Sequence, residues 1–236
     1  MRTQERHQLK TDKFAETTVE AYSWIAEHRD KILLGLLAVV VLLAVVVGGY
    51  TWMQRRNTQA NVELTEALRV YRAALTVPGM PAQPGEPSFA TAAERAKAAN
   101  AEFRKIADQY GRTSAGKVAR YFAGITADEM GDRAVAEREL KQVADSADKE
   151  LAALAKMALA GVYRSSNRDQ QAIDIYKGLI ADPTRSVGKS AAQLELAAML
   201  ETRQPGEAAK LYEEIRKEDP NSPAAQIAAS RLASAR

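Results

Sequence analysis

The chain contains no cysteine among its 236 residues, which excludes disulfides, thiolate metal sites and thiol catalysis. Its two histidines, His7 and His28, both precede residue 31, so no later segment supplies a histidine for a catalytic triad or a histidine-based metal site. No glycine-rich phosphate loop is present. With 13 glycines and 8 prolines the chain fits neither a fibrous nor a disordered class, and its net charge of +3 creates no strong field for nucleic acid. We therefore expect no enzyme, and no cofactor, metal, small-molecule substrate or nucleic-acid partner.

One long segment lacks charge altogether. From Ile32 to Gln54 there are 23 residues without a charged side chain. At 1.5 Å per residue, 19 of these span roughly 29 Å, close to the thickness of a bilayer's hydrocarbon core. The Leu, Ile and Val residues contribute about −5 kcal/mol on an insertion scale, and Tyr50 and Trp52 close the far end as interfacial aromatics do. The pattern predicts a transmembrane helix at 32–54 rather than a buried core helix.

A cleavable signal peptide is the alternative, because the small residues Gly48 and Gly49 follow the apolar run. Against it, 31 residues precede the run and no A-x-A site follows it, which favours an anchor. Within the N-terminal tail, residues 1–31, apolar positions recur at helical spacing and predict an amphipathic helix on the membrane surface. These positions are Phe14, Thr18, Ala21, Tyr22 and Ile25.

The charges that flank the segment do not decide which side carries the C-terminal domain. Basic residues lie within about 20 positions of both ends, so the positive-inside rule is silent here. They are Lys13, Arg29 and Lys31 before the segment, and Arg55, Arg56, Arg69 and Arg72 after it.

Residues 55–236 are alanine-rich and repeat with a period of 36 or 37 residues. Each period has a small residue, a large residue four positions later and an aliphatic residue three beyond that. The three series are Ala99, Ala136, Ala172 and Ala208; Phe103, Leu140, Tyr176 and Tyr212; and Ile106, Val143, Leu179 and Ile215. A second small position lies upstream, at Gly124, Ala160 and Ala197. This spacing predicts stacked helical hairpins in which small residues allow close approach and large ones fill the resulting groove.

An unspecialised alanine-rich bundle is the alternative, and the four aligned steps favour repeats. In the first unit, helices at 60–76 and 91–110 flank a proline-rich segment, 77–90, that we interpret as an extended loop, either a mere insertion or a flap over the repeat surface. A final helix at 222–235 would cap the stack. The predicted fold class is thus all-α, a single transmembrane helix followed by a helical-hairpin solenoid.

These units resemble tetratricopeptide (TPR) repeats, most clearly in Leu159-Ala160-x-x-Tyr163, then Ala172-x-x-x-Tyr176 and Pro183. The order of tail, anchor and TPR-like units resembles the ancillary TPR-like subunit family of the bacterial SecYEG translocon. The resemblance implies an inner-membrane protein with a cytoplasmic N-terminus and a periplasmic repeat domain. It also implies chaperone-like help to emerging secretory proteins, with translocon subunits as partners.

In TPR arrays the first helix of each hairpin lines a concave binding face. Carried onto this chain, those positions predict a mostly apolar floor with charges at one rim. They are Val118, Tyr121, Ile125 and Asp128; Leu154, Met157, Gly161 and Arg164; and Ala191, Leu194, Ala198 and Glu201. Such a groove suits unfolded or amphipathic segments. The same residues would also fit simple burial between helices, and the sequence leaves this open.

Three functions fit the sequence. The first is a membrane-tethered, chaperone-like scaffold at the Sec translocon, in contact with the lipid bilayer. The second is an assembly scaffold for envelope or cell-division complexes, and the third is a cytoplasmic adaptor.

Overall fold

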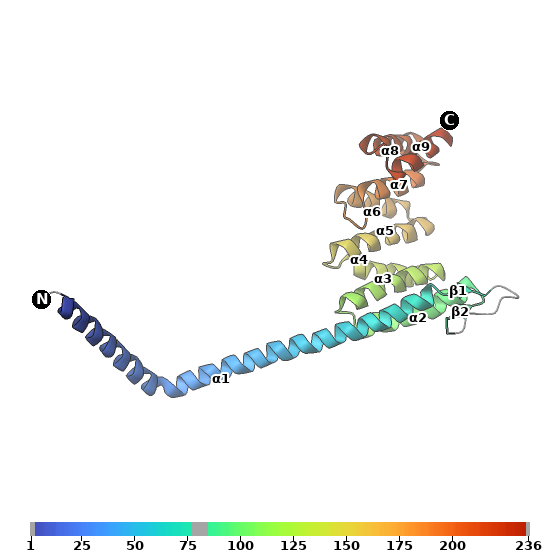
Figure 1. The fold of residues 1–236 in the computed structure, drawn as a ribbon. Helices are drawn as coiled ribbons and strands as arrows, with labels where there is room; N and C mark the ends of the chain where they lie inside the picture. The colour runs from blue at the N-terminus through green and yellow to red at the C-terminus, as the bar shows by residue number, and fades with distance from the viewer. Residues whose placement is uncertain (1–2, 77–84, 235–236) are drawn as a thin grey trace. The chain divides into compact units, whose positions relative to one another are not determined.

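The computed structural model describes residues 3–76 and 85–234, with side chains from residue 28 onward in these ranges, Ile32 excepted. The first element, α1, is the helix Thr3–Tyr71 (Figure 1). The contacts within the chain divide it into two compact units, one up to Arg55 and one from Arg56 to Arg236. The predicted apolar face of the N-terminal tail lies outside the described side chains.

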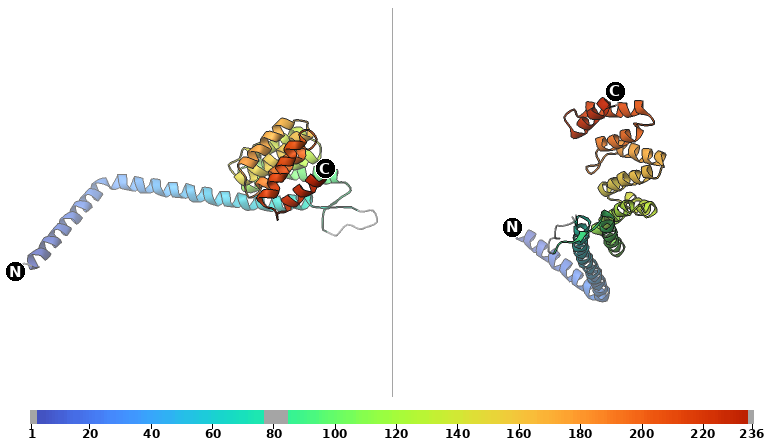
Figure 2. Two further views of the ribbon diagram at one scale, coloured as in Figure 1. Left: turned by 90° about the horizontal axis from the view of Figure 1, so that it is seen from above. Right: turned by 90° about the vertical axis from the view of Figure 1, so that its right-hand side faces the viewer.

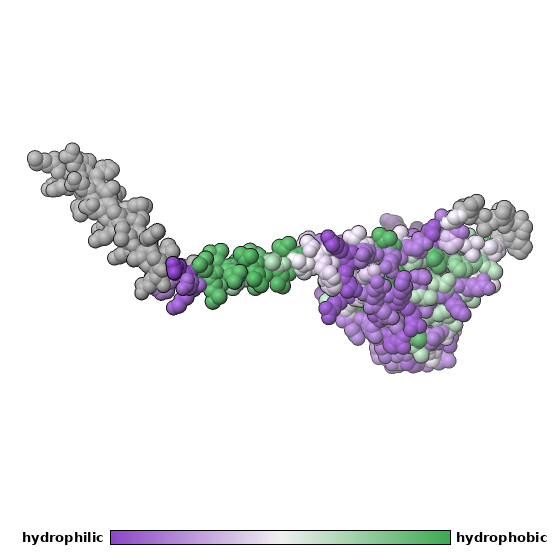
Figure 3. All heavy atoms as spheres, turned by 90° about the horizontal axis from the view of Figure 1, so that it is seen from below, coloured by the Kyte–Doolittle hydropathy of each residue, from purple (hydrophilic) through white to green (hydrophobic). Residues whose placement is uncertain are grey.

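The apolar segment of α1 exposes its side chains along its whole described length. Leu33 to Val47 include Leu34 at 70% and Val45 at 68% exposure. An 18-residue window here reaches a mean hydropathy of 3.0 with none of it buried, and the space-filling view shows an unbroken hydrophobic surface (Figure 3). Among the described residues this is the one helix long and apolar enough to cross a membrane, a test that a signal sequence also passes.

The second unit is a stack of antiparallel helix pairs (Figures 1 and 2). The end of α1 packs with α2 (Ala92–Gln109), and the following pairs are α3 with α4, α5 with α6 and α7 with α8. Their bounds are α3 Ser114–Glu129, α4 Arg133–Ala144, α5 Lys149–Ser165, α6 Asp169–Ala181, α7 Lys189–Leu200 and α8 Pro205–Glu218. A final helix, α9 (Pro223–Ser234), packs on α8. The predicted all-α class, an apolar N-terminal helix before a TPR-like repeat domain, is confirmed.

Local sequence sets where these helices begin and end. Thr91 and Thr113 accept hydrogen bonds from backbone N–H groups of the first turns of α2 and α3, and Asp132 and Asp148 do the same for α4 and α5. In the turn between α5 and α6, Asn167 adopts a left-handed conformation (φ 57°), one that asparagine tolerates better than most residues. Short polar turns of this kind keep consecutive helices antiparallel.

The repeating small and large positions form the core. Ala99, Ala136 and Ala172 are each fully buried, and Phe103 and Leu140 are likewise 0% exposed. The other large positions, Tyr176, Leu179, Tyr212 and Ile215, are also buried. The buried residues form three apolar clusters, and partly buried residues such as Val118 and Met157 connect them, as expected when each hairpin buries its face against its neighbours.

Gly124 shows why a small residue is needed on the first helix of a pair. A Cβ added there would lie 2.6 Å from Cγ and 2.9 Å from Cδ2 of Leu140. The large residue of α4 thus fills the space that the missing side chain of α3 leaves open, at less than ordinary contact distance for any Cβ.

The prediction that the first repeat helix reaches residue 76 is wrong. The last regular turn of α1 ends at Tyr71, and a two-residue strand, β1 (Ala74–Leu75), follows. It pairs in parallel with β2 (Ser88–Phe89), and the Thr76 amide donates to the Phe89 carbonyl at 2.9 Å. The β-branched side chain of Thr76 favours an extended backbone of this kind. The strand pair joins the ends of the proline-rich segment, whose residues 77–84 lie outside the described part.

One carboxylate is buried between α3 and α4. The Glu139 side chain, 7% exposed, accepts from Arg120 at 2.8 Å and from Arg138 at 2.7 Å. Two guanidinium groups thus compensate one buried carboxylate, which fixes α4 against α3.

Candidate protein-binding surface

The first helices of the hairpins carry a row of half-buried apolar side chains. On α3, Val118, Tyr121 and Ile125 lie three or four positions apart and therefore share one helix face. Leu154 and Met157 occupy the corresponding face of α5, and Leu194 that of α7. We call these six residues the A-helix face; they are Val118, Tyr121, Ile125, Leu154, Met157 and Leu194.

Each residue of the A-helix face packs its inner side on the core and leaves part of its surface exposed. Neither full burial nor full exposure applies, because these side chains stand at the edge of the packed interior. Half-buried apolar groups are held in position by the core and still offer area to a ligand. The unbranched thioether of Met157 also adapts its shape to different partners.

On α5, one position beside the apolar residues of the A-helix face has no side chain. Gly161 is half-buried, and a Cβ added there would meet nothing within 4 Å. Packing inside the chain therefore does not require a glycine at this position. Ala191 on α7 is exposed and Ala198 is half-buried, so small residues recur along this row.

The predicted rim charges differ in their surroundings. Arg164 donates to Glu195 of α7 at 3.3 Å, and both side chains are about half exposed (47% and 46%). Glu201 accepts from the Tyr212 hydroxyl at 2.7 Å and lies 3.7 Å from Arg231. Its carboxylate therefore links α7, α8 and α9, which is a structural role within the stack. Asp128 is half-buried on α3 with no side-chain partner among the described residues.

An aromatic cluster that the repeat spacing does not predict adjoins Tyr121. The Phe103 and Phe122 rings stack at 5.1 Å between centroids, and Tyr71 meets both at 6.0 and 5.7 Å. Tyr121 in turn packs edge-on against Phe122 at 5.2 Å. Phe103 is one of the recurring large positions, and Tyr71 likewise stands four positions after a small residue, Ala67. Phe122 interrupts the repeat spacing and so carries no signal.

Burial and one hydrogen bond hold Tyr71 in place. Loss of solvent contact, followed by the hydrogen bond from its hydroxyl to Glu129 at 2.6 Å, raises the pKa of Tyr71 to about 12. Burial alone raises the pKa of Tyr121. Both phenols therefore stay neutral across the physiological range, so this end of the surface is apolar with one fixed hydroxyl donor.

Within the described residues no group of three or more His, Cys, Asp or Glu side chains is arranged to hold a metal ion. What the surface offers is apolar area with peripheral charges, which is suited to recognition of polypeptide segments.

The stacked hairpins define a helical-repeat protein of the TPR-like class. The family model described as the tetratricopeptide repeat-like domain matches residues 23–182, more than half of the chain. The chain belongs to this family. Proteins with this repeat fold typically bind other proteins rather than catalyse reactions. The family therefore indicates that the chain is a protein-interaction scaffold. No curated protein and no solved structure matches the chain significantly.

Proposed function

We propose that the protein is a membrane-tethered scaffold that binds apolar polypeptide segments on its A-helix face. The observation that carries this proposal is the row of half-buried apolar side chains that continues over α3, α5 and α7. Binding to such a surface derives from buried area rather than from fixed hydrogen bonds, so segments of different sequence are accepted.

Two features support a permanent anchor over a removable signal. The family match begins at residue 23, ahead of the apolar segment, so the shared domain includes that segment. The helix α1 then continues to Tyr71, and its residues Ala60, Leu64 and Ala67 are buried in the repeat core. The apolar helix thus belongs to the same element as the first repeat helix.

Attachment to the membrane strengthens the effect of a weak binding surface. A domain held at a membrane meets segments that emerge there at a raised effective concentration, so modest affinity suffices. The resemblance to ancillary translocon subunits supports a finer version of the proposal. The N-terminus is cytoplasmic, the repeat domain is periplasmic, and secretory proteins that leave the Sec translocon are the bound segments.

Site-specific photo-cross-linking in cells tests the binding surface. A photoreactive residue at Met157 on the A-helix face is compared with one at Lys210, an exposed position on α8. We expect cross-links to emerging secretory proteins and translocon subunits from Met157, and few from Lys210. Equal labelling from both positions would overturn the surface assignment. Labelling of envelope or division proteins alone would favour an assembly scaffold instead.

The orientation needs its own test. In spheroplasts, external protease should degrade the repeat domain if it is periplasmic and leave it intact if it is cytoplasmic. Protection of the domain, with rapid digestion after lysis, would rule out the translocon version and leave a cytoplasmic adaptor.

A further inference from the structure

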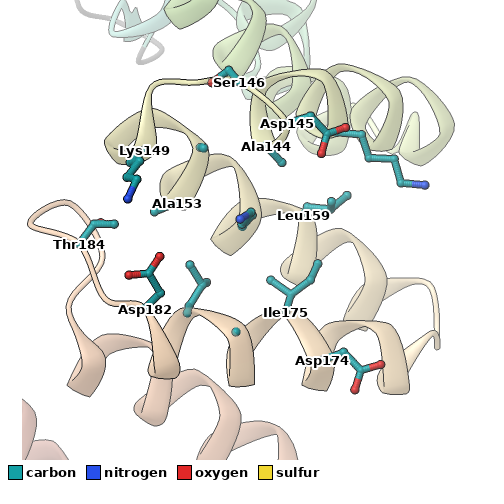
Figure 4. A pocket seen from close by; sticks show the side chains of 15 residues that line it. Ala144, Asp145, Ser146, Lys149, Ala153, Leu159, Asp174, Ile175, Asp182 and Thr184 are labelled. Atoms are coloured by element: carbon teal, nitrogen blue, oxygen red, sulfur yellow. The ribbon is translucent and has the colours of Figure 1, made fainter.

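A second concave feature lies between α4, α5 and α6 (Figure 4). It is a cleft of about 650 Å³, within the size range of ligand-binding pockets. Ala144, Ala153 and Leu179 form an apolar floor and are each less than 10% exposed. Half-buried Ile175 stands beside them on α6. We call this feature the α5–α6 cleft.

The α5–α6 cleft and the A-helix face lie on different sides of α5. Lys149, Ala153 and Lys156 line the cleft, whereas Leu154 and Met157 belong to the A-helix face. At about 100° per residue, the centres of the two sets are rotated by roughly 100° around the helix. A partner in the cleft would therefore leave the A-helix face free.

Gly178 lies in the last turn of α6, in the wall of the cleft, and no contact with the described residues requires a glycine there. It is exposed, and a Cβ added there would meet nothing within 4 Å. Glycine costs helix stability at such a position, and alanine would be accepted without a clash. The missing side chain deepens the cleft, and a close approach of another backbone gives it a physical reason.

The α5 and α6 walls of the cleft carry opposite charges. Lys149 and Lys156 stand on α5, Asp174 on α6 and Asp182 at its end, with Lys149 and Asp182 facing each other across the opening (Figure 4). On the α4 side, Lys141 and Asp145 add one charge of each sign. Among the described residues, none of the four side chains of the α5 and α6 walls forms an ion pair. Asp174 accepts a hydrogen bond from Gln170 at 2.8 Å, whereas Lys149, Lys156 and Asp182 have no side-chain partner among the described residues and are available to an occupant of the cleft.

The spacing of these charges fits a helix. Lys149 and Lys156 are seven positions apart, about 10.5 Å along α5, whereas Asp174 lies on α6 and Asp182 is the residue that ends it. A docked helix places residues i and i+7 at the same separation on one edge. An extended strand covers that distance in about three residues. The residues at the two ends of this stretch, i and i+3, then point to opposite faces and cannot both meet one wall.

We infer that the α5–α6 cleft is a second docking site, which takes an amphipathic helix of another protein. That helix carries acidic residues at i and i+7 along the edge that faces Lys149 and Lys156. It carries basic residues along the edge that faces Asp174 and Asp182, with a stripe of small apolar side chains between them. The order of the two edges fixes the direction in which the helix lies.

A matched pair of glycine substitutions in the full-length chain tests the inference. Gly178→Ala narrows the cleft, and Gly161→Ala makes the same change on the A-helix face; neither added Cβ has a neighbour within 4 Å. Both variants should melt at slightly higher temperature, by roughly 2–4 °C, because alanine favours the helix. Their folding is therefore intact by an independent measure.

The probe is a synthetic helical peptide of four turns with an Ala/Leu stripe, a Glu edge at i and i+7 and a Lys edge opposite. We expect Gly178→Ala and the double variant Lys149→Glu/Lys156→Glu to bind it about tenfold more weakly than the unmodified chain, and Gly161→Ala to bind it unchanged. A peptide whose charges are replaced by Gln should also bind weakly. Equal binding to all variants, or loss only with Gly161→Ala, would overturn the inference.

Cross-linking in cells identifies the natural occupant. A photoreactive residue at Lys156 should capture a helical segment of another protein with the stated charge edges, and the capture should fall with Gly178→Ala. Capture of a second copy of this chain, or of segments without that charge pattern, would overturn the assignment. The outcome is independent of the A-helix face, because cross-links from Met157 report on that surface separately.

Discussion

Replacing Gly124 by alanine should destabilise the repeat domain, although alanine is the better helix former. The helix preference alone favours the variant by roughly 0.5–1 kcal/mol. The new Cβ, however, would stand 2.6 Å from Cγ of Leu140, a side chain that is 0% exposed. Overpacking of this kind costs about 1–3 kcal/mol, so we expect a net loss of about 1–2 kcal/mol in the free energy of unfolding.

A double-mutant cycle with Leu140→Ala isolates the contact. Leu140→Ala alone should cost about 2–5 kcal/mol, since it empties a fully buried site. In that background the clash is gone, so Gly124→Ala should become stabilising by roughly 0.5–1 kcal/mol. The coupling energy between the two sites is therefore expected to exceed about 1 kcal/mol.

Urea unfolding of the full-length chain in detergent, followed by far-UV circular dichroism, measures each variant. The sign of the Gly124→Ala effect is decisive. A gain in stability in the unmodified background, or additive effects of the two substitutions, would refute the account of how α3 and α4 pack.

Two further substitutions test local contacts. Glu150 accepts the amide N–H of Ser186 at 2.7 Å and the Arg185 guanidinium at 3.4 Å, and these hydrogen bonds, that from Ser186 most of all, lower its pKa to about 2. Because the folded pKa lies below the unfolded one, the stabilisation is present above about pH 5 and is lost as the pH falls towards 2. Urea midpoints of the unmodified chain and Glu150→Gln should therefore differ at neutral pH and converge near pH 2; a constant gap would contradict this. Gly116→Ala should lower the melting temperature by several degrees, because the added Cβ would lie 2.0 Å from the Tyr110 carbonyl oxygen. An unchanged melting curve would show that the turn moves to accommodate the Cβ and would contradict this prediction.

The repeat architecture is predictable because small and large residues recur at one period along the chain. Ala136, Leu140 and Gly124 show the principle, since the recurrence reflects a direct contact between two helices. Periodicity of this kind survives sequence divergence, so it indicates both the helix pairs and the turns between them.

Features without a period are not predictable in this way. The two-residue strand at Ala74–Leu75 is too short to show alternation, so the spacing predicts a first repeat helix that is several residues too long. Half-burial of Leu154 and Met157 depends on how the stack is packed, and the spacing alone leaves burial and exposure equally open. The domain boundaries and the binding role of the A-helix face stay predictions.

The α5–α6 cleft has no sequence signal for a different reason. Its walls come from three helices and the turn after Asp182, and of its lining residues Leu179 alone belongs to the three recurring series. Gly178, like Gly161, is a glycine within a helix, and its meaning depends on the absence of neighbours in space among the described residues.

The central claim, that the A-helix face binds polypeptide segments, is tested most directly by filling the bare position at its centre. Gly161→Leu places an isobutyl group where a Cβ meets nothing within 4 Å, so the fold should tolerate it. Fluorescence anisotropy then measures binding of a labelled, permanently unfolded secretory segment to the full-length chain. The account predicts binding about tenfold weaker for Gly161→Leu and unchanged for Gly178→Leu, with both variants folded by circular dichroism. Equal affinity of Gly161→Leu and the unmodified chain would contradict it.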